Sequence, residues 1–368
     1  MNLSEYDWVQ IGKEDSQVND AKVVVKNGTS NTIKAGQTFV NDHAMLVYGN
    51  LTFVSDGSED DTGTLKLDVD DNITGTITAL SVSGNLAFGS DEGLGTNVEV
   101  KVGNSLKNDY AIKADGDLTI YDGSITCSTY GAIGDTSGEV FKNYGVYCGG
   151  NFTLGNGDTS LSPSLTSISS IGQGGVNALT CAGTTDTSFV MKNGELNAKS
   201  ILSAAGDCAA IDIYNENVSF EGGTVTATAG SGADSSSAYS YGIRVNTANL
   251  VIGTTSNVHE PQITTSVDNT KQIRNSYSIK NDDSIGTITI LSGTTTLDSV
   301  LGKGVVSGSG GIVLNQAEFD ITNGKQSYVA GITEIDQSDS RSPLTLKVRN
   351  ILKLAAGTDN ETMAASEH

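Results

Sequence analysis

Acidic side chains crowd one short stretch of the chain and are the first groups that could do chemistry. They are Asp56, Glu59, Asp60, Asp61, Asp68, Asp70 and Asp71. The single basic residue within this stretch is Lys66. Carboxylate oxygens gathered on loops are the ligands that Ca²⁺ takes. We therefore expect either a calcium site here or a solvated acidic loop that needs no metal. The spacing from Asp68 begins like an EF-hand loop, but Ile73 stands where that loop needs glycine.

Four tyrosines form the second candidate site, because each stands two residues before a recurring apolar position. They are Tyr110, Tyr144, Tyr241 and Tyr277. Aromatic rings on a surface can stack against sugar rings, so one interpretation is a carbohydrate-binding platform. The other is an aromatic ladder packed against the scaffold. In a strand, residues two apart share a face, which favours burial of these tyrosines.

Two further sets recur at equivalent positions of the chain. Asp212, Arg244 and Lys280 each follow the apolar position by one residue and predict either a polar site or a surface charge ladder, worth under about 1 kcal/mol per pair. Cys148 and Cys181 are also equivalent, so their Cα atoms should lie about 4.8 Å apart on neighbouring strands. That separation allows a disulfide, and the alternative is a pair of buried thiols that fill the core.

The elements that must position these residues follow from a steady repeat. An apolar anchor recurs at intervals of 32 to 36 residues. The anchors are Met45, Leu80, Ile112, Val146, Leu179, Ile211, Ile243, Ile279, Ile312 and Leu346. The residue before each anchor is small or a threonine, and the residue two after it is apolar or a thiol, apart from Asn281. Such columns of like chemistry indicate short strands with one face toward a core.

Each repeat contains two more short strands, separated by corners. An apolar pair such as Leu118 and Ile120 forms the second strand, and a segment such as Gly123–Cys127 forms the third. The corner before the second strand has an amide or a carboxylate that tolerates left-handed backbone, at Asn50, Asn85, Asp117, Asn151, Asn217 and Asn249. One such unit cannot bury its inner face alone, so copies must stack. The sequence predicts an all-β parallel β-solenoid of about ten turns of roughly 33 residues.

We expect three regions: an N-terminal cap over 1–40, the parallel β-helix over 41–355 and a flexible tail over 356–368. The formal charge of −22 disfavours nucleic acid and anionic membrane surfaces, since both would repel the chain. No apolar run of membrane-spanning length occurs in the sequence, and its first residues do not have the pattern of a secretion signal.

Catalytic sequence signatures do not occur in this chain. Hydrolases of β-helical shape have a Gly-His-Gly and an Arg-x-Lys segment, and neither is present. Lyases of this shape use an arginine base beside calcium-bound aspartates, whereas no arginine here accompanies an acidic cluster in sequence. We therefore expect a non-catalytic protein, with a polysaccharide lyase or hydrolase as the less favoured alternative.

Five segments have a recurring motif: Gly49–Phe53, Gly116–Ile120, Tyr144–Val146, Gly222–Thr226 and Tyr241–Ile243. Over roughly residues 40–355 the chain resembles the right-handed parallel β-helix modules on the surfaces of Gram-positive anaerobes, which are often labelled carbohydrate-binding. The resemblance implies an extracellular or cell-surface adhesion module that binds an acidic polysaccharide or a cell-surface glycan, with Ca²⁺ as a candidate cofactor. The main alternative is a structural surface protein or fibre-like phage protein that engages protein partners.

Overall fold

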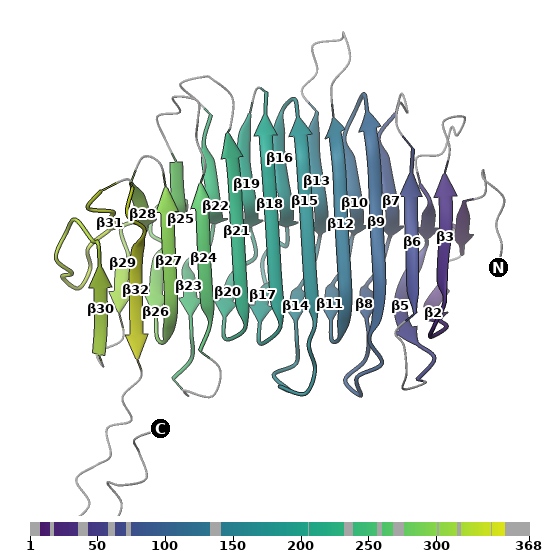
Figure 1. Ribbon diagram of the computed structural model, residues 1–368, viewed down its shortest axis with the longest axis horizontal. Coiled ribbons are helices and arrows are strands. Elements are labelled where there is room, and N and C mark those ends of the chain that lie inside the picture. The colour runs from purple at the N-terminus through teal and green to yellow at the C-terminus, as the bar shows by residue number, and fades with distance from the viewer. Residues whose placement is uncertain are drawn as a thin grey trace, which may run out of the picture.

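Short strands separated by corners alternate along the chain, as the repeat predicts. The computed structural model describes residues 8–14, 18–35, 43–57, 63–70, 75–132, 141–204, 206–231, 238–255, 260–267, 276–299, 302–314, 318–339 and 341–349. Within these ranges the chain forms strands and no helix. The strands stack into three long sheets that run the length of a rod, with β1–β3 at one end and β30–β32 at the other (Figure 1). The predicted β-solenoid is therefore confirmed.

The first sheet contains the anchors. Its strands, in order, are β1 (Val9–Ile11), β4 (Met45–Val47), β7 (Ile77–Val82), β10 (Asp109–Ala114), β13 (Lys142–Cys148), β16 (Gly175–Cys181), β19 (Asp207–Ile213), β22 (Ser240–Val245), β25 (Ser276–Asn281), β28 (Lys303–Val306) and β31 (Glu334–Asp336). All of these neighbours pair in parallel except β28 and β31, which are antiparallel.

The second sheet contains the apolar pairs. It consists of β2 (Val18–Val25), β5 (Gly49–Ser55), β8 (Leu86–Phe88), β11 (Leu118–Ile120), β14 (Phe152–Leu154), β17 (Ser188–Met191), β20 (Asn217–Phe220), β23 (Asn249–Ile252), β26 (Thr287–Ile290) and β29 (Gly311–Leu314). Stacked phenylalanines fill the core behind it, and the ring centroids of Phe152 and Phe189 are 4.8 Å apart.

The third sheet contains the strands that follow the glycine turns. It consists of β3 (Ser30–Ala35), β6 (Thr64–Val69), β9 (Thr96–Ser105), β12 (Gly123–Ala132), β15 (Ser164–Gly172), β18 (Glu195–Ser203), β21 (Thr224–Ser231), β24 (Gln262–Val267), β27 (Gly293–Ser299), β32 (Leu344–Arg349) and β30 (Glu318–Thr322). The last two run antiparallel to their neighbours, so the coiling stops at this end.

The regular part of the rod has about eight turns of about 32 residues, fewer than the ten predicted. The first eight anchors pair in register from Met45 to Ile279, as predicted. The last two anchors are wrong. Val305 is the partner of Ile279, and Ile312 belongs to the second sheet, where it pairs with Ile288. The coil after β25 is shorter than the repeat, so counting by the period reaches the wrong strand.

The N-terminal stretch contributes a coil of its own before these eight turns. The stretch 1–40 was expected to cap the rod, and its strands β1, β2 and β3 occupy the first position in all three sheets. Each pairs in parallel with the next coil, as in Val9 with Met45. A break in register between Val18 and Asp20 explains why the sequence repeat does not extend this far. The expected tail over 356–368 lies outside the described residues.

Small residues stand before the anchors because two successive side chains point inward at that position. In β10 both Ala111 and Ile112 are buried, whereas Tyr110 and Lys113 on either side are half-buried. A Cβ atom on the equivalent Gly145 would lie 2.0 Å from the hydroxyl of Ser167. The position before the anchor therefore requires a small residue. Because two successive side chains point inward there, residues earlier in the strand point to the opposite side from the one that strict alternation predicts.

The corner amides act through hydrogen bonds rather than through left-handed backbone. Asp186 and Asn323 are the only described non-glycine residues with positive φ, so the left-handed interpretation of the corners is wrong. Instead, four of the six corner side chains accept a backbone N–H from the next coil, namely those of Asn50, Asn85, Asp117 and Asn151. The amide N–H of Asn85 donates to Oδ1 of Asn50 at 2.9 Å, and that of Asp117 donates to Oδ1 of Asn85 at 2.9 Å. This ladder ties successive coils together along the rod.

The two equivalent cysteines are buried free thiols. Cys148 and Cys181 are partners on β13 and β16, and neither is in a disulfide. Burial raises the pKa of Cys181 well above its usual value, so its thiolate is disfavoured. The thiol of Cys148 donates to the carbonyl of Asn151 at 3.2 Å. The interpretation as core-filling thiols is confirmed.

Candidate functional site

The outer side of the first sheet, from β10 to β25, gathers most of the candidate side chains, and we call it the tyrosine face. Two rows of equivalent positions define it. The row two before the anchor contains Tyr110, Tyr144, Asn177, Ala209, Tyr241 and Tyr277, and the row one after it contains Lys113, Tyr147, Thr180, Asp212, Arg244 and Lys280. Successive coils lie about 4.8 Å apart, so each row is a continuous ladder of contacts.

The four predicted tyrosines lie on this face and not in the core. Tyr110, Tyr144 and Tyr277 are half-buried, and only Tyr241 is covered, at 2% exposure. The prediction of burial from parity is wrong for these three, because the two inward residues at the anchor shift the alternation by one. Tyr241 is covered by neighbouring side chains on the outside of the sheet. The sequence therefore placed them on the wrong side of the sheet.

The first tyrosine cluster consists of Tyr110, Tyr144 and Tyr147. The rings of Tyr110 and Tyr144 are stacked, with centroids 4.9 Å apart and planes 9° apart. Tyr147 meets both rings edge to face, at 6.0 Å from each centroid. Such pairs contribute about 0.5–1.5 kcal/mol beyond the area they bury. In the stack, one face of each of the Tyr110 and Tyr144 rings is occupied by the other ring.

The second tyrosine cluster is larger and contains two cations. Tyr241 is stacked between Tyr239 and Tyr277, with centroids 5.9 and 5.8 Å away. The ammonium of Lys280 lies 4.7 Å from the centroid of Tyr277, and the guanidinium of Arg244 lies 4.8 Å from that of Tyr241. Cation–π contacts of this kind contribute about 0.5–2 kcal/mol, most when water is excluded.

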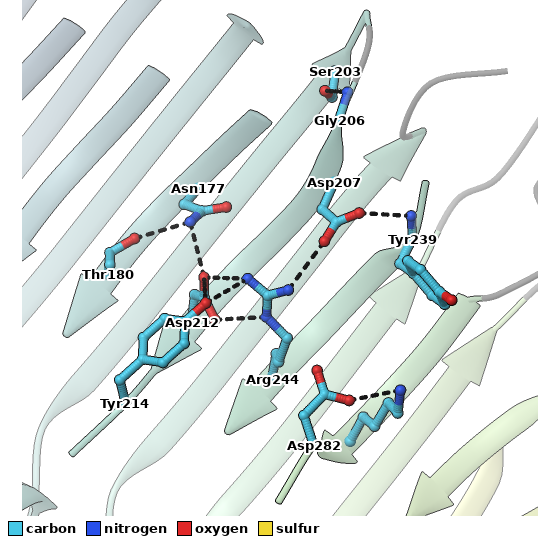
Figure 2. Close-up of polar contacts among 11 residues, drawn as sticks. Asn177, Thr180, Ser203, Gly206, Asp207, Asp212, Tyr214, Tyr239, Arg244 and Asp282 are labelled. Atoms are coloured by element: carbon cyan, nitrogen blue, oxygen red, sulfur yellow. Dashed lines mark hydrogen bonds and ion pairs between the residues drawn. The ribbon is translucent and has the colours of Figure 1, made fainter. Parts of the chain in front are cut away.

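Arg244 and Asp212 form a largely buried ion pair between these clusters. Nε of Arg244 donates to Oδ1 of Asp212 at 2.7 Å and Nη2 donates to Oδ2 at 2.6 Å, a bidentate geometry (Figure 2). The side chain of Asp212 is 2% exposed and that of Arg244 is 16% exposed. The prediction of a surface charge ladder is therefore wrong for this pair. Aromatic side chains cover it, which sequence spacing could not show.

Further polar groups extend the pair into a network. Nη1 of Arg244 donates to Oδ2 of Asp207 at 3.0 Å, and the amide of Asn177 donates to Oδ2 of Asp212 at 3.0 Å. The hydroxyl of Tyr214 accepts from Nη2 of Arg244 at 3.0 Å. Figure 2 shows Arg244 between the two carboxylates, with Asn177 and Tyr214 on the other side of Asp212. The network fixes the guanidinium in one orientation.

Burial and neighbouring charges shift the pKa values of several groups on and beside the tyrosine face. Burial by itself lowers the pKa of Arg244, but hydrogen bonding and charge from Asp212 outweigh this and raise it. Burial, together with the charge of Asp212, raises the pKa of Tyr214 to about 12. Burial raises the pKa of Tyr144 and of Tyr241 above their usual values. Arg244 is therefore charged and these tyrosines are neutral near neutral pH.

A hollow opens beside the network at the edge of the tyrosine face. It has a volume of about 230 Å³ and is lined by Lys142, Gly174, Gly175, Asn177, Gly206, Asp207 and Arg244. Glycines keep it open, because they place no side chain in it. Among the described residues Lys142 has no ion-pair partner, and no side chain or N–H of those residues donates to Oδ1 of Asn177. The ammonium donors of Lys142 and the acceptor Oδ1 of Asn177 therefore both line this hollow.

The predicted calcium ligands do not converge where the structure describes them. Asp68 and Asp70 lie on or next to β6, and each is near a lysine: Asp70 is 3.2 Å from Lys34 and Asp68 is 4.0 Å from Lys101. Asp56 is exposed. Glu59, Asp60, Asp61 and Asp71 lie outside the described residues. No group of three or more potential metal ligands occurs among the residues that the structure describes.

Several members of the site were missed in the sequence. Tyr147 stands one residue after its anchor, in the row that also contains Arg244, so the repeat could have identified it. Tyr214 stands three after its anchor and has the same parity. Asp207 and Lys142 both stand four residues before their anchors, and the long side chain of Arg244 reaches Asp207 from the next coil. None of the described segments forms a helix long and apolar enough to cross a membrane.

Comparison with known proteins adds no further assignment: no family model matches this sequence, and it has no match among the curated proteins or the solved structures.

Proposed function

We propose that this protein is a non-catalytic, extracellular or cell-surface module that binds carbohydrate through the tyrosine face. The hollow beside Arg244 is the observation that supports this most, because Lys142, which has no ion-pair partner among the described residues, and Oδ1 of Asn177, which accepts from none of them, line it next to Arg244. Sugars present hydroxyls that both donate and accept, together with C–H faces that pack on aromatic rings. Tyr214, at 41% exposure, has the most accessible ring of the network.

Rigidity of the scaffold favours binding at this face. The network holds Arg244 in a fixed orientation, so a ligand that meets it does not have to order a mobile arginine. The strands beneath are paired on both sides within a long sheet, which fixes the spacing of the rows. A polysaccharide or cell-surface glycan can therefore meet preformed groups over several coils. The resemblance to surface modules labelled carbohydrate-binding agrees with this proposal.

A glycan array probed with and without EDTA tests the proposal directly. Binding to a defined set of glycans supports it. An absence of signal in both conditions would contradict it and favour the structural or fibre-like protein, whose long regular rod engages protein partners. Release of unsaturated or reducing products from polygalacturonate would instead indicate a lyase or hydrolase.

Filling the hollow is expected to weaken binding without harming the fold. A Cβ atom on Gly175 would meet its nearest neighbour, the backbone oxygen of Asp207, at an ordinary 3.5 Å. Gly175→Val places two methyl groups in the hollow, and valine suits a strand. We expect glycan affinity to fall at least about tenfold, the size of a lost contact of about 1.4 kcal/mol, with an unchanged melting temperature.

The matched control is Thr226→Val, which places valine on the outer side of the third sheet at a half-buried position. It should leave both affinity and melting temperature unchanged. Equal affinity of Gly175→Val and the parent would remove the hollow from the binding site.

Calcium is proposed as a second ligand, held by the acidic stretch around Asp60 and Asp61. If it binds, a concentration of 100 times Kd should stabilise the parent by about 2.7 kcal/mol. Asp60→Asn with Asp61→Asn should fold normally and lose this stabilisation. Thermal unfolding with calcium and with EDTA measures the effect, and isothermal titration of the parent that gives no heat with Ca²⁺ would argue against a calcium site.

A further inference from the structure

One carboxyl group is sealed inside the rod directly behind the tyrosine face. Asp109 begins β10, points into the interior and has 0% exposure. Its partners on the neighbouring strands are Ile77 on β7 and Asn143 on β13, and both side chains are also fully buried. Asp109 and Asn143 are thus stacked one strand spacing apart, about 4.8 Å between backbones. Ile77 closes the other side with an apolar group.

The three side-chain oxygens of this pair do not find hydrogen-bond partners among the described residues. Both carboxyl oxygens of Asp109 and Oδ1 of Asn143 are buried without a donor. The amide nitrogen of Asn143 is already used, since it donates to the carbonyl of Ile171 at 2.8 Å. The hydroxyl of the nearby Ser105 donates to the carbonyl of Lys107 at 2.9 Å. Three acceptor oxygens on paired residues are therefore buried without a donor among the described residues, which is costly unless a hydrogen lies between them.

No described charge compensates an ionised Asp109. On the elements packed against it, the charged side chains are Glu99 and Lys101 on β9, Lys142 on β13 and Lys107 in the turn before β10, and all are exposed or half-buried. Lys113 and Asp115 point outward beyond Asp109 on its own coil and pair with each other. β7 has no charged side chain, and Cys127 on β12 is a buried neutral thiol. A buried carboxylate without a counter-ion is strongly disfavoured.

We propose that Asp109 is a proton-binding site of the folded rod, in which the neutral carboxylic acid donates its O–H to Oδ1 of Asn143. The proton stays on Asp109 and satisfies one oxygen of each side chain. The bond joins two successive coils from within. Those coils are the ones on which Tyr110 and Tyr144 stack, because each tyrosine directly follows one member of the pair.

Stability should therefore depend on pH in a defined direction. Burial raises the pKa of Asp109 from 3.8 to about 8, and Ser105 offsets only part of this. Between these values the folded protein retains a proton that the unfolded chain has lost, so stability falls as pH rises through this window. The unfolding equilibrium constant should increase tenfold per pH unit on account of this group. Below pH 4 and above pH 8 its contribution should be flat.

The test compares the parent with Asp109→Asn, which is neutral at every pH and nearly the same shape. Chemical unfolding of the full chain from pH 4 to 9 gives the ratio of the two unfolding constants. We expect the parent to become less stable relative to the variant by about tenfold per unit between pH 5 and 7. Asp115→Asn, at an exposed position on the same coil, is the control and should follow the parent in this window.

Two outcomes would overturn the proposal. Parallel pH profiles for the parent and Asp109→Asn would show that Asp109 ionises normally. Lower stability of the variant at pH 8 would show that an ionised Asp109 is held by a bound cation or water. If the variant does not fold, the carboxyl carbon shift of Asp109 in the labelled parent decides, since a midpoint below pH 5 contradicts the proposal.

A second readout follows the tyrosines. Near-ultraviolet circular dichroism of the parent should change around pH 8 as the coil pair loosens, and Asp109→Asn should not show this change. Burial raises the pKa of Tyr110 and of Tyr144 above the usual value, so ring ionisation does not obscure this range. A circular dichroism signal of the parent that is constant through pH 9 would show that ionisation of Asp109 does not affect the tyrosine stack. Glycan binding plays no part in either readout, so their failure leaves the proposed function untouched.

Discussion

Val245→Asp is expected to unfold the solenoid. Val245 is fully buried on β22, two residues after its anchor, and lies between Ile213 and Asn281 of the neighbouring coils. A carboxylate placed there would have no charged partner and would lose its water, at a cost of about 4 kcal/mol or more. Domains are stable by about 5–15 kcal/mol, so a loss of this size is most of the margin at the lower limit and about a quarter of it at the upper limit. Thermal or urea unfolding followed by circular dichroism measures this loss.

The same column shows what makes a polar side chain tolerable in it. Asn281 is buried there, but its amide nitrogen donates to the carbonyl of Thr247 at 2.9 Å and its Oδ1 accepts the backbone N–H of Asp283 at 3.2 Å. Val245 has no such turn beside it. The control is Val251→Asp on the outer side of β23, which should cost little because that position is half-buried and reaches water. If Val245→Asp melts like the parent, the inward assignment of this column is wrong.

Asp212→Ala should destabilise the protein by about 3–5 kcal/mol, because it leaves the guanidinium of Arg244 buried beside aromatic rings without its main partner. Asp212 accepts two of the hydrogen bonds of Arg244 and is almost inaccessible to water. The matched control is Asp115→Ala, which breaks the exposed pair with Lys113 and should cost under about 1 kcal/mol. Unfolding free energies of the two variants give the comparison.

A double-mutant cycle separates the pair from its surroundings. Asp212→Leu with Arg244→Met removes both charges and should recover much of the stability that the single substitution loses, since only Asp207, which water partly reaches, is left without Arg244. Equal losses of unfolding free energy in the single and double variants would show that Arg244 is not destabilising when Asp212 is absent. If Asp212→Ala lowers the unfolding free energy by less than about 1 kcal/mol, the interpretation as a surface charge ladder is favoured after all.

The repeat made the neighbours along the rod predictable. Parallel strands that stack in register place equivalent residues next to each other, so the pairing of Tyr110 with Tyr144 and of Asp212 with Arg244 follows from counting alone. The prediction failed where the period changed. At the C-terminal end the shorter coil moved Ile312 into a different sheet, and antiparallel strands ended the stack.

Membership of the candidate site could be predicted only in part, because it joins residues from different positions of the repeat. Asp207 stands five residues before Asp212 on the same strand, yet both reach Arg244 on the next coil. The long side chain of Arg244 spans that distance, and no periodic pattern records its direction. The acidic stretch, in contrast, was conspicuous in sequence, and its described members Asp68 and Asp70 lie beside lysines.

The sequence by itself determined the parallel β-solenoid, its three strands per coil and which residues stack on which. Only the tertiary structure decided which side of the sheet the tyrosines occupy and how deeply their neighbours are covered. The physical reason is the same in both cases. Two inward residues at each anchor reverse the alternation, and tyrosines on adjacent coils then exclude water from Arg244 and Asp212. Spacing along the chain determines which residues are neighbours on successive coils, whereas burial depends on the volume that all neighbouring side chains fill together.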